Sequence, residues 1–317
     1  MKRLFVLAFL CCSVTAFCQL KTVPRNPADK FVYILGITQD GGYPQAGCDK
    51  QCCKDYWTGK TRERHVTCLA LVDMKSQQYW LIEATPDFAY QLHNVQKLFD
   101  SKKMPAGIFI THAHIGHYTG LMQLGRESMG AKDVPVWVMP RMDTFLRKNG
   151  PWSQLVSLNN ISLNTLHADS TVKLGDAFKL TPISVPHRDE FSETVGFIIE
   201  ADGKKLLFIP DIDKWEKWKL NIVEQIKKMD YAILDGTFCD ASELPGRNMS
   251  EIPHPFVMES LQLFDPLPAT EKKKKVFIHF NHTNPLIKDD SPARKAIEAK
   301  GMMVAFENAY IPLEPSK

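Results

Sequence analysis

Three histidines crowd into the run Thr111-His112-Ala113-His114-Ile115-Gly116-His117, in a chain of 317 residues that has only ten. Residues 107–110, just before this run, are β-branched and aromatic and predict a buried strand. Ligands bind at the carboxyl ends of such strands in α/β sheets. His112 and His114, two apart in extended chain, face the same way, and the turn into a helix carries His117 round to them. This density of imidazoles indicates a zinc-type metal site, because crowded free histidines have no structural use.

The first residues have the layout of a secretory signal peptide. Lys2 and Arg3 precede an apolar stretch at residues 4–12, and small residues follow near Ala16 and Cys18. We expect residues 1–18 to be cleaved and the protein to be exported, to the periplasm or the extracellular space. Lipid attachment at Cys18 is the less favoured alternative. The apolar stretch is too short for a membrane span, and no later run reaches the roughly 20 apolar residues required, so we expect no integral membrane segment after cleavage.

The charge balance of the mature chain is close to neutral. Removing two basic residues with the signal leaves 37 basic against 36 acidic residues, a net charge of +1. No strong field therefore favours nucleic acid or anionic membrane, and we expect a small-molecule substrate. No linker, repeat or low-complexity tract divides residues 19–317, which we interpret as a single domain. The sequence does not specify an oligomeric state.

Strand-like and helical runs are interspersed along the chain. The strand-like runs cover residues 31–37, 66–73, 79–83, 107–110, 134–139, 178–185, 195–201, 205–210, 231–234 and 276–280. The helical runs cover residues 87–99, 117–129, 141–148, 214–229 and 255–264. Because hairpins alternate with helices, this order favours a layered α/β sandwich over a doubly wound sheet.

Further histidine and aspartate residues follow other predicted strands. His187, Asp211 and His279 each come at the end of such a run. At this point the sequence resembles the metallo-β-lactamase fold superfamily, whose signature is a His-x-His-x-Asp-His loop, a later His, a bridging Asp and a final His. The matching positions, in order, are His112, His114, Gly116, His117, His187, Asp211 and His279. The resemblance implies an αββα four-layer sandwich.

One branch is more closely similar: the pyrroloquinoline quinone biosynthesis protein B-like proteins, with the cyclic-phosphate phosphodiesterases of phosphonate breakdown. The segments that carry this resemblance lie at residues 35–45, 83–87, 185–196, 210–215 and 278–285. Together they extend over nearly the whole mature chain. They identify the branch better than the activity, since one fold hosts many reactions.

The resemblance implies two metal positions. The first is held by His112, His114 and His187, and the second by His117 and His279, with Asp211 bridging both. Gly116 stands where the superfamily has an Asp ligand, so the second position lacks one carboxylate. Nearby acidic residues, Asp189 or Asp213, could compensate, but we favour the interpretation that each contacts a metal ligand from outside or lies on the surface. We expect one or two catalytic zinc ions, with iron or manganese as alternatives.

The intact histidines favour hydrolysis, because the quinone biosynthesis proteins tend to replace the first histidines of this loop. Zinc lowers the pKa of bound water towards ~7 and polarises a scissile bond. The resemblance thus implies a phosphodiester or cyclic-phosphate hydrolase. The alternatives are a quinone biosynthesis B-like oxygenase or accessory protein that binds metal without hydrolysis, and a metal-binding protein without turnover.

Cysteines suggest a separate site. Beyond the signal, five remain, an odd count that argues against a simple disulfide framework: Cys48, Cys52, Cys53, Cys68 and Cys239. In the phosphodiesterase relatives, a compact Cys cluster in the loop after the first strand joins a His three residues beyond the last catalytic His. The resemblance therefore implies a structural zinc on Cys48, Cys52, Cys53 and His282. Disulfide pairing is the rival, and Asp49 or Cys68 could replace one ligand.

Four further positions have expected roles near the metals. His254 lies in a loop where hydrolases of this superfamily place a general acid, and Arg247 before it could hold a charged substrate. A helix-start His without a chemical role is the alternative. Glu83 and Asp87 fall where the family has an acidic residue that orients the metal-binding histidines.

Overall fold

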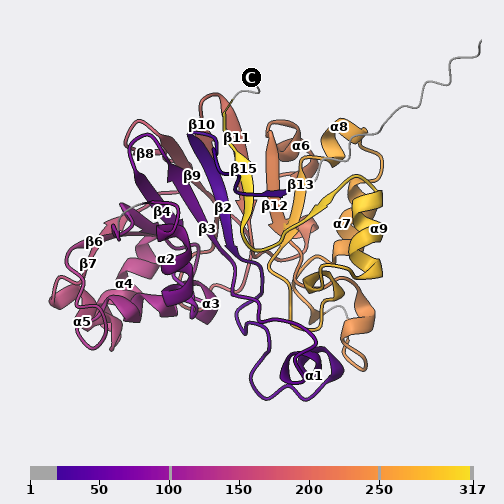
Figure 1. Ribbon diagram of the computed structural model, residues 1–317, viewed down its shortest axis with the longest axis horizontal. Coiled ribbons are helices and arrows are strands. Elements are labelled where there is room, and N and C mark those ends of the chain that lie inside the picture. Colours follow the sequence, from indigo (N-terminus) through magenta and orange to yellow (C-terminus); the bar gives the residue numbers. More distant parts are fainter. Residues whose placement is uncertain (1–19, 100–101, 249–250, 315–317) are drawn as a thin grey trace, which may run out of the picture.

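The computed structural model describes residues 20–99, 102–248 and 251–314, so the expected signal peptide at residues 1–18 lies outside the described residues. Within these ranges, two β-sheets pack face to face and helices cover their outer faces (Figure 1). The predicted αββα arrangement is confirmed. Among the helices in these ranges, none is long and apolar enough to cross a bilayer.

The first sheet carries the three-histidine segment. Its strands, in spatial order, are β1 (Lys21–Thr22), β15 (Ala309–Pro312), β2 (Lys30–Gly36), β3 (Cys68–Asp73), β4 (Gln78–Ile82), β5 (Gly107–Phe109), β6 (Val134–Val138) and β7 (Ile161–Thr165). Pairing is antiparallel from β1 to β4 and parallel from β4 to β7. The short β1, β7 and β15 were not predicted.

The second sheet carries the remaining expected ligands. Its strands, in spatial order, are β14 (Met303–Val304), β13 (Lys275–Ile278), β12 (Tyr231–Asp235), β11 (Lys204–Ile209), β10 (Val195–Ala201), β9 (Phe178–Ser184) and β8 (Val172–Leu174). Pairing is parallel from β14 to β11 and antiparallel from β11 to β8. Parallel strands in register end at one edge, so the segments after β11, β12 and β13 emerge together.

Helices lie on both sides of the sheet pair. They are α1 (Gln51–Trp57), α2 (Phe88–Gln96), α3 (Ile115–Tyr118), α4 (Pro140–Lys148), α5 (Trp152–Ser157), α6 (Ile222–Lys227), α7 (Val257–Phe264), α8 (Ala269–Lys272) and α9 (Pro292–Ala299). Short 3₁₀ segments occur at Thr119–Leu124, Trp215–Lys217, Ala241–Glu243 and Pro285–Ile287. In Figure 1, α2 to α5 flank the first sheet, α7 and α9 flank the second, and α1 projects from one end.

Two expected helices are interrupted. The run at residues 117–129 is only a short α3 followed by a 3₁₀ segment, because Gly120 packs so tightly that a Cβ there would lie 2.0 Å from the carbonyl oxygen of Thr85. The run at 214–229 splits because the side chain of Asn221 accepts hydrogen bonds from the backbone of Val223 and Glu224 and starts α6 anew.

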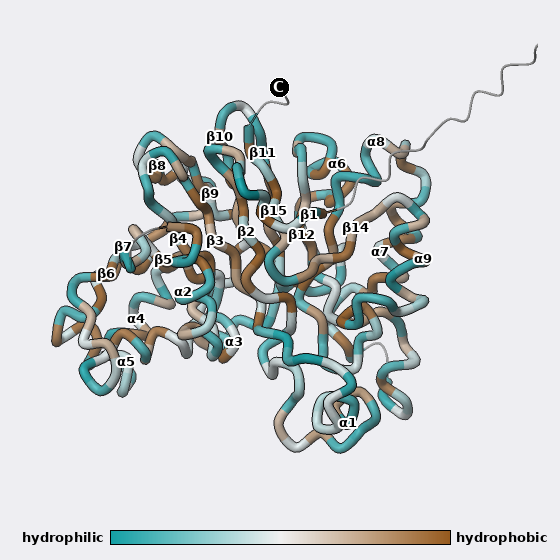
Figure 2. Tube along the Cα trace, in the orientation of Figure 1, coloured by the Kyte–Doolittle hydropathy of each residue, from teal (hydrophilic) through white to brown (hydrophobic). Residues whose placement is uncertain are grey.

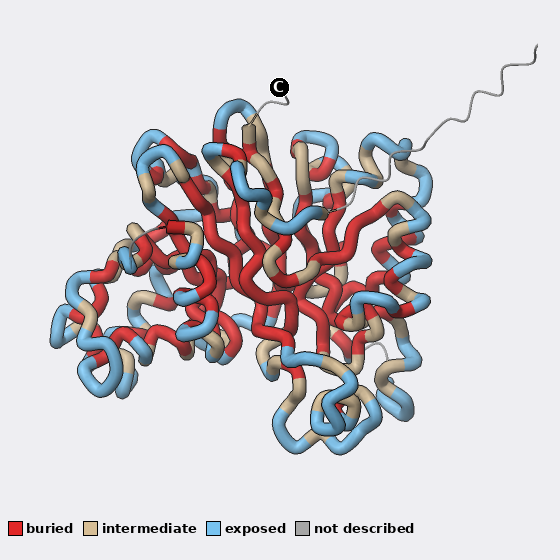
Figure 3. Tube along the Cα trace, viewed as in Figure 1, coloured by how far each residue is buried: buried red, intermediate tan, exposed pale blue. Residues whose placement is uncertain are grey.

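The first sheet is apolar on both faces. In β2, Val32 and Ile34 face the second sheet, while Phe31, Tyr33 and Leu35 face the layer of α2 and α4. This period-two alternation gives each strand two buried faces, which explains the nearly continuous apolar runs in the sequence. The strands accordingly appear brown in Figure 2 and red in Figure 3.

Candidate metal centre

Four of the expected ligands converge at one edge of the sheets. His112 and His114 follow β5, His187 follows β9 and Asp211 follows β11. Relative to Asp211 Oδ2, His187 Nε2 lies at 3.1 Å, His112 Nε2 at 3.4 Å and His114 Nδ1 at 3.8 Å. These ligand atoms all lie within 4.8 Å of one another, close enough to share a single ion.

A second group lies against the first. His117 on α3 and His279 after β13 meet with Asp40, a residue that the sequence analysis did not select. His117 Nε2 lies 3.2 Å from Asp40 Oδ1 and 3.9 Å from Asp211 Oδ2. Asp211 thus stands between the two groups, as expected for a carboxylate that bridges two metals.

The inward-facing atoms of both groups fit the metal that the fold family implies. In the described part of the chain, seven of these atoms are buried without a hydrogen-bond partner: His112 Nε2, His114 Nδ1, His117 Nε2, His187 Nε2, His279 Nε2, Asp40 Oδ1 and Asp211 Oδ1. An unsatisfied buried polar group costs about 1–3 kcal/mol. A cation in each group would satisfy these atoms, since imidazole nitrogens and carboxylate oxygens are ligands for zinc and similar metals.

The outward nitrogens of four histidines have partners that fix their protons. The Nδ1 contacts are Thr111 Oγ1 with His112 at 2.9 Å, Glu83 Oε1 with His117 at 3.1 Å, Asp213 Oδ1 with His187 at 3.2 Å and Thr237 Oγ1 with His279 at 3.0 Å. A proton held on Nδ1 leaves Nε2 as the lone pair for a metal. His114 is reversed, with Nδ1 inward and Nε2 3.7 Å from Glu190 Oε2.

Two threonine hydroxyls connect the imidazoles of His112 and His279 to buried carboxylates. Thr111 Oγ1 donates to Glu83 Oε1 at 2.6 Å, and Thr237 Oγ1 donates to Asp235 Oδ1 at 2.7 Å. Each hydroxyl is then free to accept from the neighbouring imidazole. The expected orienting position of Glu83 agrees with this geometry. Asp87 instead accepts from the backbone of Val66 at 2.7 Å, away from the histidines.

The centre is electrostatically suited to a cation. Burial lowers the pKa of His187, but Asp211 and Asp213 outweigh it and raise that pKa to about 10. Glu83 and Asp40 likewise hold the pKa of His117 well above its usual value despite burial. Five carboxylates, those of Asp40, Glu83, Asp211, Asp213 and Asp235, lie around the histidines. The protein therefore stabilises positive charge at this site.

The backbone at His279 adopts an unusual conformation within the metal centre. It has φ of 68°, a left-handed conformation that non-glycine residues rarely adopt. Residues held in such conformations cluster at functional sites, where the surrounding structure over-determines them. The strand edge and the Thr237 contact hold this residue with its ring towards His117, at 5.4 Å between ring centroids.

Neither Asp189 nor Asp213 lies beside Gly116. Asp213 contacts the outer nitrogen of His187, and Asp189 is exposed and contacts Arg141 Nη1 at 3.4 Å. Asp40 occupies the space beside Gly116 instead. Its position after the end of β2 is the same strand-end signal that identified the other ligands.

His254 lies at the centre. It is buried, and its Nδ1 lies 2.9 Å from Asp235 Oδ2 and 3.1 Å from Asp211 Oδ1. Burial lowers its pKa, but these two carboxylates raise the pKa above the usual value. The structure thus gives His254 more than a helix-start position. Arg247 is exposed in its loop, where its backbone N–H donates to Leu244 O at 3.2 Å.

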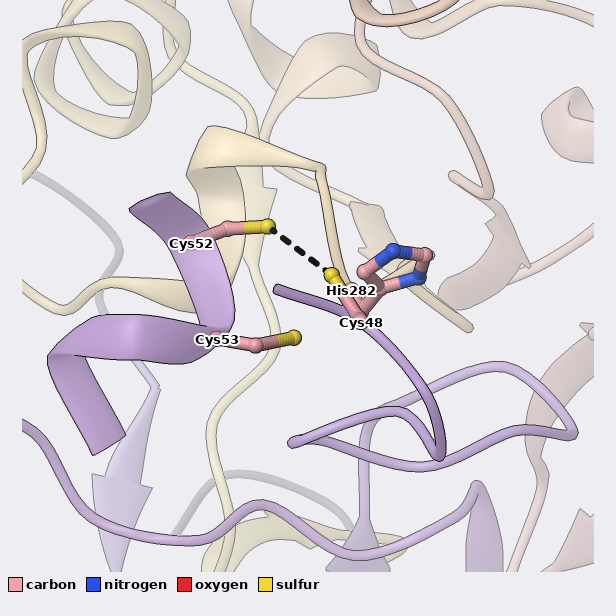
Figure 4. Close-up of side chains that lie close together, drawn as sticks. All are labelled: Cys48, Cys52, Cys53 and His282. Carbon is pink, nitrogen blue, oxygen red and sulfur yellow. Dashed lines mark hydrogen bonds between the residues drawn. The ribbon is translucent and has the colours of Figure 1, made fainter. Parts of the chain in front are cut away.

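The cysteine cluster forms as expected. Cys48, Cys52 and Cys53, the last two on α1, converge with His282 in Figure 4, and the four ligand atoms lie within 4.8 Å of one another. The sulfurs of Cys48 and Cys52 are 3.9 Å apart. Zinc–sulfur bonds of about 2.3 Å in a tetrahedron place thiolates about 3.8 Å apart.

The disulfide and the two alternative ligands can be compared with this geometry. All five described cysteines are free thiols. Cys68 is buried in β3, where its sulfur lies 3.7 Å from the carbonyl oxygen of Glu83, and Asp49 is exposed.

Comparison with known proteins agrees with this fold. A family described as "Beta-lactamase superfamily domain" matches residues 79–280, a span that contains the histidine ligands and Asp211 but neither Asp40 nor the three clustered cysteines. Coenzyme PQQ synthesis protein B of Stutzerimonas stutzeri is 26% identical over 313 residues and covers 89% of this chain and 99% of that protein.

Two solved structures share the architecture. Zn²⁺-bound PqqB from Methylobacterium extorquens has a TM-score of 0.74 at 22% identity, covering 89% of this chain and 100% of that one. A diphosphatase of the PhnP family has a TM-score of 0.59 at 20% identity, covering 89% and 96%. These similarities therefore lie in the branch that the sequence resembles, that of the pyrroloquinoline quinone biosynthesis protein B-like proteins and their phosphodiesterase relatives.

Proposed function

The chain belongs to the β-lactamase superfamily, and from this premise we propose that it is a metal-dependent hydrolase of phosphodiesters or cyclic phosphates. One observation carries the proposal: five inward imidazole nitrogens lie in two adjoining groups with Asp211 between them, and these nitrogens are buried without a hydrogen-bond partner in the described residues. The similarity to a diphosphatase fold supports phosphate esters ahead of lactones and β-lactams.

The metals would be held by His112, His114 and His187 at one position and by His117 and His279 at the other, with Asp211 between them. A divalent cation there supplies Lewis acidity, which lowers the pKa of a bound water towards ~7 and polarises the scissile group. We propose zinc, with iron or manganese as alternatives. The substrate is a small molecule.

His254 is the candidate for the general acid. Asp235 holds the proton on Nδ1, so Nε2 is the nitrogen left to face a substrate. Burial lowers the pKa of His254, but Asp235 and Asp211 raise it overall, which favours the protonated imidazole that a leaving alkoxide needs. Asp211 stabilises this cation, and it also fixes the distance between His254 and the metal ligands.

The test compares substrates on purified, zinc-reconstituted protein. We expect hydrolysis of bis(4-nitrophenyl) phosphate and of a five-membered cyclic phosphodiester, with little turnover of a lactone or a β-lactam. The control is Asp176→Ala, which alters an exposed carboxylate in the turn between β8 and β9, at the opposite end of β9 from His187. Metal-loaded protein that binds metal at full stoichiometry yet hydrolyses no phosphate ester would contradict the proposal.

The second candidate is a role in coenzyme PQQ synthesis without hydrolysis. The observation that favours it is the match to a protein of that name over 89% of the chain. Metal content after purification from the native host separates the two candidates, since redox-active iron with substrate-dependent oxygen uptake supports the second and zinc supports the first.

Two further proposals concern the rest of the chain. The Cys48, Cys52, Cys53 and His282 cluster would hold a structural zinc, because four protein ligands leave no open position for substrate. Export after cleavage near Cys18 remains a proposal that rests on the first residues. Mass spectrometry of the mature amino terminus from the native host tests it.

A further inference from the structure

The second metal position has a carboxylate that comes from outside the histidine motif. Gly116 stands at the place of the usual Asp ligand, but the space beside it is filled. A Cβ built on Gly116 would lie 2.3 Å from Asp40 Oδ1 and 2.6 Å from Asp40 Cα. Such distances do not occur between non-bonded atoms, so a side chain at residue 116 and Asp40 exclude each other. Asp40 therefore takes the volume that the missing aspartate would need.

The Asp40 side chain points into the metal centre. Its Oδ1 lies 3.2 Å from His117 Nε2, and this oxygen is buried with no hydrogen-bond partner in the described residues. The other oxygen, Oδ2, accepts from Gln39 Nε2 at 3.2 Å. One oxygen is thus anchored and the other is left facing the nitrogens of His117 and His279, which are unsatisfied themselves.

The backbone fixes Asp40 at this place. Thr38 pairs with Phe280 in a parallel bridge, and Gln39 N donates to Phe280 O at 2.9 Å. This pairing ties the segment after β2 to the residue that follows His279. Gly42 N then donates to Gln39 O at 2.8 Å, which closes a turn around Asp40. The loop is therefore held by two independent backbone contacts, so Asp40 is preorganised against His279.

We propose that Asp40 is a ligand of the second metal and replaces the carboxylate that Gly116 lacks. The second position is then His117, His279 and Asp40 with the bridging Asp211, which restores two carboxylates and two imidazoles. The proposal rests on the proposed metal-dependent function, and it is tested by metal binding rather than by turnover. The rival role for Asp40 is an ion pair with protonated His117 and no metal contact.

The experiment counts metals at the catalytic centre. Mn²⁺ is titrated into protein whose cysteine cluster is zinc-filled, with free Mn²⁺ followed by electron paramagnetic resonance, because manganese prefers carboxylate and imidazole over thiolate. We expect the wild-type centre to bind two ions. Asp40→Ala should still bind the first ion with unchanged affinity, while the second binds on the order of 100-fold more weakly.

Paired variants distinguish a ligand from a structural contact. Gly116→Asp alone should impair the second position, because its Cβ collides with Asp40. The double variant Asp40→Gly with Gly116→Asp should recover two tightly bound ions, since the carboxylate returns from the position usual in the superfamily. Asp176→Ala, which alters an exposed carboxylate in the turn between β8 and β9, is the control, and circular dichroism confirms folding of each variant.

Three outcomes would overturn the assignment. The first is a wild-type centre that saturates at one ion. The second is an Asp40→Ala variant that binds two ions with wild-type affinity, which would leave only the ion pair. The third is a folded double variant that gains no second ion over Asp40→Gly alone. Loss of hydrolysis with both ions still bound would contradict the proposed function and leave this assignment standing.

Discussion

His282→Ala should destabilise the protein by removing a cross-link. If zinc joins His282 to the cysteines of α1, it closes a loop of about 230 residues, and the chain-entropy treatment of cross-links gives about 5 kcal/mol for that length. An unfolding entropy of about 2.1 cal/mol/K per residue, over about 300 residues, converts this into a fall in melting temperature of about 8 °C. The thiolates of Cys48, Cys52 and Cys53 remain, so zinc can stay bound to them while the cross-link to residue 282 is lost.

The assay is thermal unfolding with and without a zinc chelator, together with zinc content by mass spectrometry. Chelation should lower the wild-type melting temperature by a similar amount and change His282→Ala much less, because the cross-link is already gone. Cys53→Ser should lose about one zinc per chain while the catalytic centre still binds metal, and Asp176→Ala should match wild type. An unchanged melting temperature in His282→Ala would refute the reasoning, as would thiol titration that finds these cysteines oxidised in pairs.

Four other changes test the metal centre and its surroundings. His112→Ala should strip the tighter catalytic metal and abolish hydrolysis, as metal content and turnover would show. Asp213→Asn should weaken that metal about 10–100-fold in calorimetry, because it loosens a ligating imidazole. His254→Ala should slow an alkyl phosphodiester by ~10²–10⁴ but a nitrophenyl ester far less, and equal losses would argue against a general acid. Burial lowers the pKa of His65, but Glu307 raises it overall, so this pair stabilises the protein at low pH and the contribution is lost as pH rises through the raised pKa. Urea unfolding of His65→Gln between pH 6 and 9 should show a flatter dependence on pH, and an unchanged slope would contradict the pairing.

Most of the candidate metal ligands could be predicted from the sequence because each of them follows a strand-forming run. Each of His112, His187, Asp211 and His279 comes directly after an apolar run that had to be a strand, and strands in register end at one edge. The cysteine cluster was accessible only through the family resemblance, since nothing local connects Cys53 with His282. The short β8 and β14 were missed because runs of two or three residues have no measurable periodicity.

Asp40 marks the limit of that reasoning. It also follows a strand, but nothing in the sequence relates it to Gly116, 76 positions later in the chain. Asp189 and Asp213 were considered because they lie close in sequence to the expected ligands, whereas the actual neighbour of Gly116 is set by the parallel bridge between Thr38 and Phe280.

The sequence by itself determined the layered α/β class, the chemistry of the donors and the strand ends from which they project, because periodicity and residue type are local properties. Only the tertiary structure decided which nitrogen of each histidine faces inward, which carboxylate fills the gap at Gly116 and which residues fix each proton. These depend on the pairing of the two sheets across more than two hundred residues, and pairing is settled by burial and backbone hydrogen bonds that no single segment contains.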